Sequence, residues 1–294
     1  MMSSNLKDVS VVIPVYNEEK VVGRCLESLV RQTLKPKEII VVDDGSTDGT
    51  EREVEIAASQ TPRNDIKILR QNHKGAGAAR NLGVAQAKGD ILVFVDADMT
   101  FSKTFLEDLV KPIQDGKSKG TFSKLEYIAN WNNRWARFWN YAKGIYEPRS
   151  IPANYPKEAP VFRAILKTEF EKASGFDENK GYNDDWSLSE KLGIKATEAK
   201  VRFFHYNPEN LTEAFIQARW AGKREYKFGI LGGLIKEFPL WAVAVGVIRV
   251  IGERRKINES LMSLLTLYPL FLLVVKTAAT IGVIEFTFWG KPSK

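Results

Sequence analysis

The stretch from Ile91 to Asp98, with the sequence ILVFVDAD, constrains the fold of this chain more than any other segment. Its apolar, mostly β-branched part ends in two carboxylates that stand one residue apart, Asp96 and Asp98. A short continuous apolar run is typical of a strand that is buried on both faces of a parallel sheet. In open α/β sheets, ligands bind beyond the carboxyl ends of the strands. The two acids are therefore placed to hold a hard cation against phosphate oxygens, although an acidic turn would give the same run.

The first hundred residues alternate between apolar strand patterns and helical patterns. Predicted strands cover residues 9–13, 38–42, 66–69 and 91–95. Apolar residues at helical spacing between 21 and 30 and an Ala-rich segment from 75 to 87 predict helices, with Asn17 as the cap of the first. Strands that alternate with helices predict a parallel sheet with helices on both faces. Because crossovers are right-handed, we expect the carboxyl ends of these strands at one edge of the sheet.

Polar, acidic or Gly-rich segments follow all four predicted strands. These segments are residues 14–19, 43–50, 72–77 and 96–98. A helix cap or a turn explains any one of them, but four of them at one edge of a sheet are better explained by a binding site. We therefore expect the functional site at the carboxyl edge of the sheet.

Composition narrows the class of protein further. The chain has 294 residues, 44% of them hydrophobic, and a net charge of +7, which suits anionic partners such as nucleotides or phospholipid surfaces. The basic residues cluster near apolar segments, so we expect a membrane and no nucleic acid as the partner. A single cysteine, Cys25, excludes an internal disulfide. The first residues lack the apolar core of a signal peptide, so we expect this part of the chain in the cytoplasm.

The regular alternation ends after residue 100. An aromatic segment from Trp131 to Tyr141 carries basic residues and places most of its rings on one helical face. The segment reads either as an aromatic core helix or as an interfacial helix whose rings lie at the headgroup level of a membrane. Residues 147–160 hold four prolines and predict an extended loop.

The last part of the chain is much more apolar than the rest. Residues 228–251 are apolar but interrupted, and basic residues flank them on both sides, which predicts an interfacial or re-entrant segment. Residues 261–284 are long enough to span a bilayer and contain one charge, Lys276. We expect a transmembrane helix over residues 261–284, with a buried core helix as the alternative.

Four stretches of sequence occur in an order and spacing that resemble a known family. They are VSVVIPVYNEE at 9–19, EIIVVDDGSTDGT at 38–50, NHKGAGAARNLGVAQAKGDILVFVDADM at 72–99 and SGFDENKGYNDDWSLSEKL at 174–192. The chain resembles the family 2 glycosyltransferases over roughly residues 8–220. The resemblance implies a GT-A catalytic domain over residues 1–222, which is a Rossmann-like α/β fold with a mostly parallel sheet and flanking helices. A membrane-associated region with interfacial and transmembrane helices would follow over residues 223–294.

The resemblance implies a role for each matched position at the sheet edge. The residues that would line the nucleoside pocket or hold the nucleotide sugar are Pro14, Tyr16, Glu18, Asp43, Asp44, Lys74, Gly75, Arg80 and Asp96. Asp43 would support its loop or be a simple turn residue, and Arg80 would face the diphosphate or act as a structural ion-pair partner. Asp98 would coordinate Mn²⁺ or Mg²⁺, with Asp96 in the metal shell or on the ribose. The cation would stabilise the departing nucleoside diphosphate.

The family also places a catalytic base in an acidic pair after a Gly-rich turn. The pair here is Asp184 and Asp185, where the family usually has Glu first, and Asp185 aligns with the base. Both acids could instead cap the helix that follows. Arg219 and Trp220 resemble the end of the Gln-x-x-Arg-Trp motif of membrane-bound synthases, although Ile216 stands at the Gln position. The motif implies that Arg219 helps to hold acceptor and diphosphate, and that Trp220 stacks on a sugar or packs.

Together these resemblances imply an inverting, metal-dependent hexosyltransferase. It would move a sugar from a nucleotide-diphosphate sugar to a lipid-linked or membrane-delivered saccharide acceptor, at the cell membrane and on its cytoplasmic side. A polysaccharide synthase-like transferase is one alternative, and the departure at Ile216 weakens it. A non-catalytic protein that binds nucleotide sugars or lipids is another, and the presence of both Asp98 and Asp185 argues against it.

Overall fold

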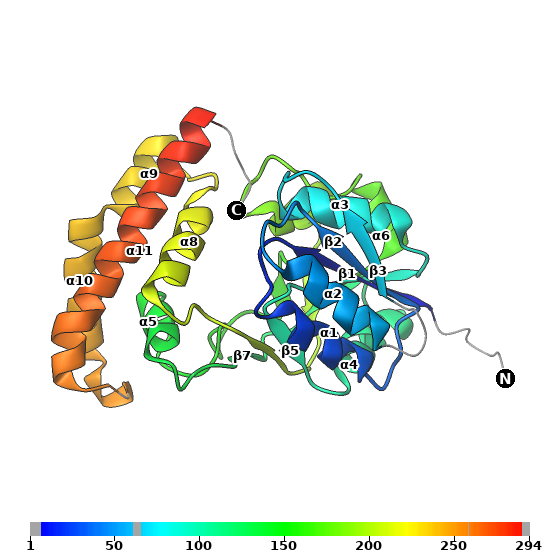
Figure 1. Ribbon diagram of the computed structural model, residues 1–294, viewed down its shortest axis with the longest axis horizontal. Coiled ribbons are helices and arrows are strands. Elements are labelled where there is room, and N and C mark those ends of the chain that lie inside the picture. Colours follow the sequence, from blue (N-terminus) through cyan, green and yellow to red (C-terminus); the bar gives the residue numbers. More distant parts are fainter. Residues whose placement is uncertain (1–6, 61–65, 258, 290–294) are drawn as a thin grey trace. The chain divides into compact units, whose positions relative to one another are not determined.

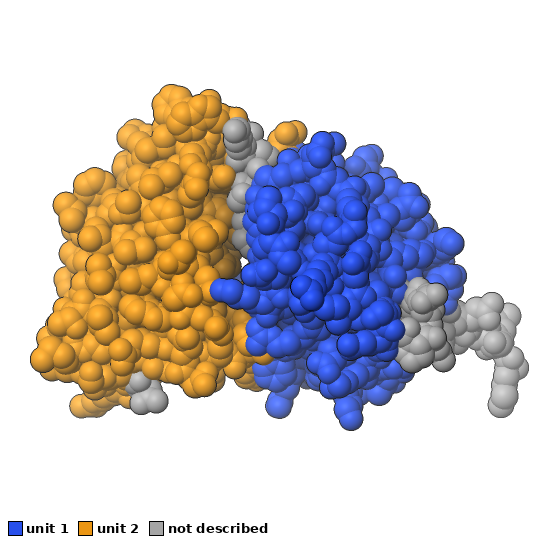
Figure 2. Space-filling model, viewed as in Figure 1, with its two compact units in different colours: residues 1–126, 153–178, 184–204 blue, residues 127–152, 179–183, 205–294 orange. Residues whose placement is uncertain are grey.

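The computed structural model describes residues 7–60, 66–257 and 259–289. The chain forms two compact units that interleave along the sequence (Figure 2). Unit 1 consists of Met1–Glu126, Ala153–Glu178 and Asp184–Phe204, and unit 2 of Tyr127–Pro152, Asn179–Asn183 and His205–Lys294. Residues 205–222, which the sequence groups with the catalytic domain, therefore belong to unit 2 by their contacts.

Unit 1 is built on an eight-stranded sheet in the order β3-β2-β1-β4-β9-β6-β10-β8. Its strands are β1 (Val9–Val15), β2 (Glu38–Asp43), β3 (Ile66–Arg70), β4 (Ile91–Phe94), β6 (Gly120–Phe122), β8 (Glu158–Ala159), β9 (Ala164–Leu166) and β10 (Ala196–Glu198). The first four strands in the chain pair in parallel, whereas β9 is antiparallel to both β4 and β6. The mostly parallel sheet predicted from the sequence is confirmed.

Strand β1, in the interior of the sheet, runs two residues beyond the predicted end and includes Pro14. Its partner β4 pairs only with Val9–Val12, while β2 continues alongside as far as Val15. Pro14 has no N–H to donate, and it lies where one side of the strand has already lost its partner. The proline therefore marks the place where β1 leaves the sheet toward the loop that follows it.

Helices cover both faces of the sheet in unit 1 (Figure 1). One face packs against α1 (Val22–Val30), α2 (Thr50–Ser59) and α4 (Phe105–Gln114). The other packs against α3 (Ala76–Gln86), α6 (Lys167–Lys172) and α7 (Ser187–Leu192). Alternate residues of β1 divide between the two cores, Ile13 on one side and Val12 on the other. This two-faced burial explains why the strands read as continuous apolar runs.

Two local features of unit 1 differ from, or add to, the sequence prediction. Asn17 does not cap α1, because its backbone is left-handed, with φ of 57°, and its side-chain oxygen accepts from the backbone N–H of Thr47. Helix α3 lies very close to the sheet, since a Cβ added to Gly83 would stand 2.5 Å from Cγ1 of Val12. The absence of a side chain at Gly83 therefore allows α3 to pack closely against the face of the sheet.

Unit 2 is mainly helical (Figure 1). Its helices are α5 (Arg134–Ala142), α8 (Leu211–Gly222), α9 (Gly229–Glu237), α10 (Pro239–Gly252) and α11 (Leu261–Trp289), with a short 3-10 turn, η2 (Arg254–Lys256). Short strands β7 (Glu126–Ile128) and β11 (Phe203–His205) lie where the chain passes from one unit to the other. Strand β5 (Met99–Phe101) belongs to unit 1 and follows residues 96–98, which we call the acidic loop.

The aromatic helix of unit 2 packs inward. Phe138 and Tyr141 of α5 are fully buried and contact Tyr268 and Phe271 of α11. For Phe138 and Tyr141, the structure therefore supports the prediction of an aromatic core helix over that of an interfacial helix. The tryptophans of the same segment are only partly buried against this cluster.

The apolar C-terminal part divides into three helices. The segment predicted at 228–251 breaks at Phe238, and Pro239 takes the first position of α10, where its missing N–H is tolerated. Among the described residues, α11 is the one helix long and apolar enough to cross a membrane, with a mean hydropathy of 1.9 over its most apolar window. That window is 44% buried within the protein, so α11 also belongs to the core of unit 2.

Candidate active site

The loops at the carboxyl edge of the sheet are tied together by two acids that follow β2. Asp43 accepts a hydrogen bond from the backbone N–H of Ser46, at 2.8 Å, so it stabilises its own turn. The buried carboxylate of Asp44 accepts from the backbone N–H groups of Lys74 and Gly75, at 2.8 Å each. Gly75 has φ of 102°, a conformation that favours glycine, and it begins helix α3. Asp44 therefore anchors the start of α3 beside the end of β2.

A stacked ring pair joins the loops that follow β1 and β3. The rings of Tyr16 and His73 lie 3.9 Å apart with an interplanar angle of 18°. Pro14 near the end of β1 and Glu18 in the loop that follows it are partly exposed, and the side chain of Lys74 is exposed next to His73. The structure therefore brings the sequence-predicted nucleoside residues of three strand ends to one edge.

The Asp96 carboxylate lies between two arginines. Arg80 of α3 donates from Nη2 to Oδ1 of Asp96, at 2.9 Å, and Arg163 donates from Nη1 to Oδ2, at 3.0 Å. Arg80 also donates from Nη1 to Oδ2 of Asp184, at 3.0 Å, and its guanidinium lies over the ring of Phe176. Arg80 is 8% exposed and acts here as an ion-pair partner that connects the end of β4 to the acidic pair.

The acidic pair forms the 3-10 turn η1 (Asp184–Trp186) directly before α7. Burial raises the pKa of Asp184, against the opposing effect of Arg80. Burial and the neighbouring Asp184 raise the pKa of Asp185 to about 7, although Arg80 and Arg163 oppose this. Burial alone would lower the pKa of Arg80, but the surrounding carboxylates raise it above its ordinary value, so the guanidinium stays charged.

The buried thiol of Cys25 lies beside the acidic loop. Cys25 of α1 donates from Sγ to the carbonyl oxygen of Asp96, at 3.7 Å. Burial raises the pKa of this thiol well above its usual range, and the carboxylates of Asp98, Asp96 and Glu18 raise it further. The thiol therefore stays neutral, and three carboxylates gather near it.

The donor set of this edge fits a divalent cation. Asp98 supplies the hard carboxylate oxygens that Mg²⁺ and Mn²⁺ prefer. Both oxygens of Asp96 accept from arginines, which favours an outer role for this residue. The carboxylates of Asp96, Asp98, Asp184 and Asp185 outnumber the guanidinium groups of Arg80 and Arg163. Within the described residues no three acidic, His or Cys side chains form a complete metal site, so phosphate oxygens of a ligand would have to complete it.

Arg219 and Trp220 lie on α8, in unit 2. Nε of Arg219 donates to both carboxylate oxygens of Glu285, at 2.9 Å each. Trp220 packs edge-on against Tyr182, with the ring centres 4.8 Å apart. In the structure, Arg219 therefore forms an ion pair with Glu285, and Trp220 makes an aromatic contact with Tyr182.

The sequence analysis missed two residues of the site. Arg163 stands just before β9, and Phe176 lies beneath the guanidinium of Arg80. Arg163 lies outside the four stretches that resemble the family, whereas Phe176 lies inside the stretch 174–192 but has an apolar side chain that does not signal a site residue. The antiparallel pairing of β9 with β4 brings Arg163 to Asp96, and this pairing has no local signal in the sequence.

The fold and the site together define a GT-A-type α/β protein whose acidic loop and acidic pair meet at the carboxyl edge of the sheet. The family model described as glycosyl transferase family 2 matches residues 10–172, more than half of the chain. The protein belongs to the glycosyl transferase family 2.

Curated relatives support the same family. Glycosyltransferase GlyG of Streptococcus pneumoniae is 37% identical over 108 residues, which are 36% of this chain and 35% of GlyG. The uncharacterized glycosyltransferase EpsJ of Bacillus subtilis is 30% identical over 226 residues, which are 70% of this chain and 63% of EpsJ. The chain thus spans between about a third and two thirds of the length of these relatives.

Solved structures share the fold at lower identity. The mannosyltransferase PcManGT from Pyrobaculum calidifontis, in complex with GDP-Man and Mn²⁺, has a TM-score of 0.56 at 18% identity, covering 96% of this chain and 87% of that one. TarS 1-349 of S. aureus in complex with UDP has a TM-score of 0.53 at 20% identity, covering 93% and 90%. The predicted GT-A fold is therefore confirmed.

Proposed function

We propose that this protein is an inverting, metal-dependent glycosyltransferase that uses a nucleotide-diphosphate sugar as its donor. The observation that carries the proposal is the cluster at the carboxyl edge, in which Asp185, with a pKa of about 7, lies among Asp184, Asp96 and two arginines. A general base works best when its pKa lies near the pH of its surroundings. A carboxylate on the surface of a protein would be too weak a base for this role.

The proposed donor site lies along the loops that follow β1, β2 and β3. Tyr16 and His73 offer a stacked aromatic surface beside the partly exposed Pro14 and Glu18. Lys74 adds a positive charge next to the backbone of Gly75, as a diphosphate requires. The solved relatives that carry UDP or GDP-Man support a nucleotide sugar as the ligand.

Asp185 is the proposed base, and burial and the neighbouring charges set its pKa. The residue would take the proton from an acceptor hydroxyl as that oxygen attacks the anomeric carbon, and a single displacement of this kind inverts the anomeric centre. Asp184 raises the pKa of Asp185, while Arg80 and Arg163 lower it. Arg80 also fixes Asp184 through an ion pair of 3.0 Å, so it is a positioning residue for the pair.

Asp98 is the proposed protein ligand of Mn²⁺ or Mg²⁺, with Asp96 in an outer position. When bound, the cation would stabilise the negative charge that develops on the departing nucleoside diphosphate. Asp96 would keep its two arginines in place and orient them beside the acidic loop. Arg80 and Arg163 would thereby hold the acidic loop and the acidic pair in one arrangement.

The acceptor is proposed to be a saccharide that is lipid-linked or delivered at the membrane. Helix α11 has the length and composition of a span, and Arg249, Arg254, Arg255 and Lys256 precede it. Basic residues next to a membrane span favour the cytoplasmic side, so we place the catalytic part of the chain in the cytoplasm. In this proposal the catalytic part covers residues 1–222, and the membrane-associated region covers residues 223–294. Arg219 and Trp220 remain proposed contacts to acceptor and diphosphate on the basis of their motif. For Arg219, the ion pair with Glu285 would have to rearrange.

Two substitutions test the assignment of roles in unit 1. Asp98→Asn should abolish the increase in thermal stability that Mn²⁺ and a nucleotide sugar produce together, because the metal loses its protein ligand. Asp185→Asn should keep this increase but lower the transfer rate by roughly 10²–10⁴-fold, the usual contribution of a general base. A screen of nucleotide sugars by thermal shift, followed by transfer assays with the sugar that binds, measures both effects.

The control is Asp108→Asn, an exposed acid of α4 that undergoes the same change of charge in the same unit. It should leave both binding and transfer unchanged. Near-normal transfer by Asp185→Asn would contradict the base assignment. Loss of donor binding in Asp185→Asn, with binding intact in Asp98→Asn, would reverse the two roles.

A further inference from the structure

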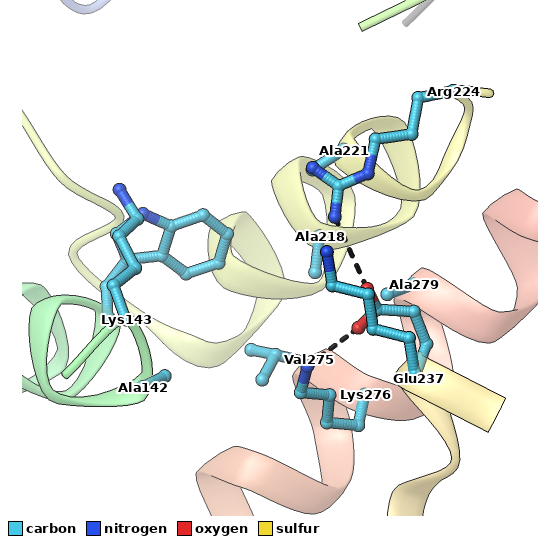
Figure 3. Close-up of a pocket in the computed structure, with 11 residues that line it drawn as sticks. Ala142, Lys143, Ala218, Ala221, Arg224, Glu237, Val275, Lys276 and Ala279 are labelled. Carbon is cyan, nitrogen blue, oxygen red and sulfur yellow. Dashed lines mark hydrogen bonds and ion pairs between the residues drawn. The ribbon is translucent and has the colours of Figure 1, made fainter. Parts of the chain in front are cut away.

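A pocket whose lining lies wholly in unit 2 gathers basic side chains among apolar ones, and two of its lining residues, Ala218 and Ala221, flank Arg219 and Trp220 on α8. Its volume is about 170 Å³, and helices α5, α8, α9 and α11 all contribute to its lining (Figure 3). Small apolar residues such as Ala218, Val275 and Ala279 form part of the wall. The charged residues that line it are Lys143, Arg224, Lys236, Glu237 and Lys276. Four basic groups against one acid leave the pocket strongly positive.

The acid of the pocket is buried and shared between two cations. Glu237 is 4% exposed, and its carboxylate lies 2.7 Å from Nζ of Lys276 and 3.3 Å from Nη2 of Arg224 (Figure 3). A guanidinium has five N–H donors and an ammonium has three, whereas a carboxylate has only two oxygens. One carboxylate therefore cannot saturate the two cations that it holds in place.

The edge of the pocket adds further positive charge. Lys236 is exposed, and its ammonium lies 5.8 Å from the ring centre of Tyr226. Lys143, directly after α5, is exposed, and its ammonium lies 5.5 Å from the ring centre of Trp139, which also lines the pocket. Partial burial lowers the pKa of Lys236, and Arg224 and Lys276 lower it further, although Glu237 opposes this effect. A bound anion would relieve the repulsion between these cations.

The outer surface of α9, which contributes to the pocket, and of α10, which follows it in the chain, is apolar. Large hydrophobic side chains that are more than half exposed occur on α9, α10 and the residues that join them, namely Leu231, Ile235, Phe238, Leu240, Trp241 and Ile248. A soluble surface seldom exposes so many large apolar side chains next to one another along the chain. A ligand that fits both features carries an anionic head and an apolar chain.

We propose that this pocket binds the terminal phosphate group of a membrane lipid, with the lipid chain along the apolar surface of α9 and α10. A terminal phosphate presents several charged oxygens to cations that approach from different helices. A headgroup with a further substituent on its phosphate offers fewer such oxygens and is larger. The inference deepens the proposed function, because it gives a phosphate-bearing lipid a site in the membrane-associated region on which that function rests.

The test uses the full chain in detergent micelles and counts bound lipids by native mass spectrometry. Phosphatidic acid carries a terminal phosphate, whereas phosphatidylserine and phosphatidylcholine carry substituted ones. We expect adducts of phosphatidic acid to exceed those of the other two lipids at equal concentration. Lys236→Gln should lower the phosphatidic acid adduct roughly tenfold, the effect of losing one hydrogen bond to a charged group.

The matched control is Lys256→Gln, which removes the same charge from an exposed site of unit 2 that does not line the pocket. It should leave the preference for phosphatidic acid unchanged. Glu237→Gln should strengthen the adduct, because the pocket then gains one unit of positive charge. Thermal unfolding of each variant checks that unit 2 is intact.

Three results would overturn the proposal. They are equal adducts for the three lipids, an equal loss in Lys236→Gln and Lys256→Gln, and displacement of the lipid by inorganic phosphate at similar concentration. The last result would assign the pocket to a soluble anion instead. Donor binding, measured on the same samples with a nucleotide sugar and Mn²⁺, separates failure of this site from failure of the proposed function, since Lys236 has no role in the donor site.

Discussion

At the scale of single residues, the balance of charge around Asp185 determines its chemistry. Among the described residues, the carboxylates of Asp96, Asp184 and Asp185 lie near the guanidinium groups of Arg80 and Arg163. Burial removes hydration from the Asp185 carboxylate, and this carboxylate also ionises against the negative charge of its neighbours. This arrangement raises the pKa of Asp185 to about 7 and makes its ionised form unfavourable for folding.

A raised pKa in the folded state has a defined consequence for stability. In the unfolded chain, an aspartate titrates near pH ~3.9. The folded state binds the proton of Asp185 up to about pH 7. The stability contributed by this proton is fully present below the unfolded pKa and is lost as the pH rises through the folded one. Asp185 therefore destabilises the protein most under the conditions in which it can act as a base.

We predict that Asp185→Asn raises the free energy of unfolding at about pH 8 and changes it little at about pH 4. The gain should be about 1–3 kcal/mol, after allowance for the partial exposure of the side chain, with about 2–4 °C in Tm for each kcal/mol. Thermal unfolding at both pH values measures it. Asp108→Asn should show no such dependence on pH, and an equal gain for Asp185→Asn at both values would contradict the raised pKa.

The sequence identified much of this site, but not all of it. Asp96, Asp98, Asp184, Asp185 and Arg80 all stand in stretches that resemble the family, so the resemblance was sufficient to select them. Arg163 could not be selected in this way. It reaches Asp96 only because β9 pairs antiparallel with β4, across 67 positions of sequence. Contacts that depend on such long-range pairing leave no local pattern to read.

At the scale of secondary-structure elements, the strands and helices of the first hundred residues follow their patterns closely. The predicted strands at 38–42 and 66–69 correspond to Glu38–Asp43 and Ile66–Arg70. The observed boundaries differ from the prediction where tertiary contacts decide them, as at Pro14 in β1 and at Asn17 before α1. After residue 100 the strands are two or three residues long, too short for a periodic pattern to show.

Helices α8 and α11 of unit 2 touch through glycine. A Cβ added to Gly282 would lie 2.0 Å from the carbonyl oxygen of Arg219, and one added to Gly222 would lie 2.2 Å from that of Ala279. Real Cβ atoms do not approach backbone oxygens so closely, so the two helices must separate if a side chain is added. The close approach keeps α8 packed along α11 in the core of unit 2.

We therefore predict that Gly282→Ala destabilises unit 2 by about 1–3 kcal/mol, the usual penalty for overpacking a core. Thermal unfolding of the full chain in detergent measures it. The control is Gly252→Ala at the end of α10, where nothing lies within 4 Å of the added Cβ. This control should be neutral or slightly stabilising, because alanine favours the helix more than glycine does. Equal effects of the two substitutions would show that α8 and α11 do not pack through these glycines.

At the scale of the whole molecule, the division into units was hidden from the sequence because the chain passes between them more than once. Residues 127–152 and 179–183 belong to unit 2, although unit 1 residues precede and follow them. A prediction that divides the sequence into continuous domains assigns such short insertions to the domain that surrounds them. The apolar composition after residue 223 did indicate a second region, because composition needs no knowledge of contacts.

The last prediction concerns the surroundings of unit 2. Leu273, near the middle of α11, is 40% exposed, and Ile56 of α2 in unit 1 is exposed to the same extent. If water surrounds both, a lysine at either position should change stability by no more than about 0.5 kcal/mol. If α11 lies in a bilayer, Leu273→Lys should cost about 2.5–3.5 kcal/mol and Ile56→Lys should stay neutral.

Fractionation of cells that produce each variant measures the difference. The unsubstituted protein and Ile56→Lys should remain in the membrane pellet after a high-salt wash, since apolar contact with lipid does not weaken with salt. Leu273→Lys should be depleted from that pellet or accumulate as aggregate. Release of the unsubstituted protein by salt alone would instead show that the basic residues around α10 hold it at the surface through charge, and that α11 serves only as the core helix of unit 2.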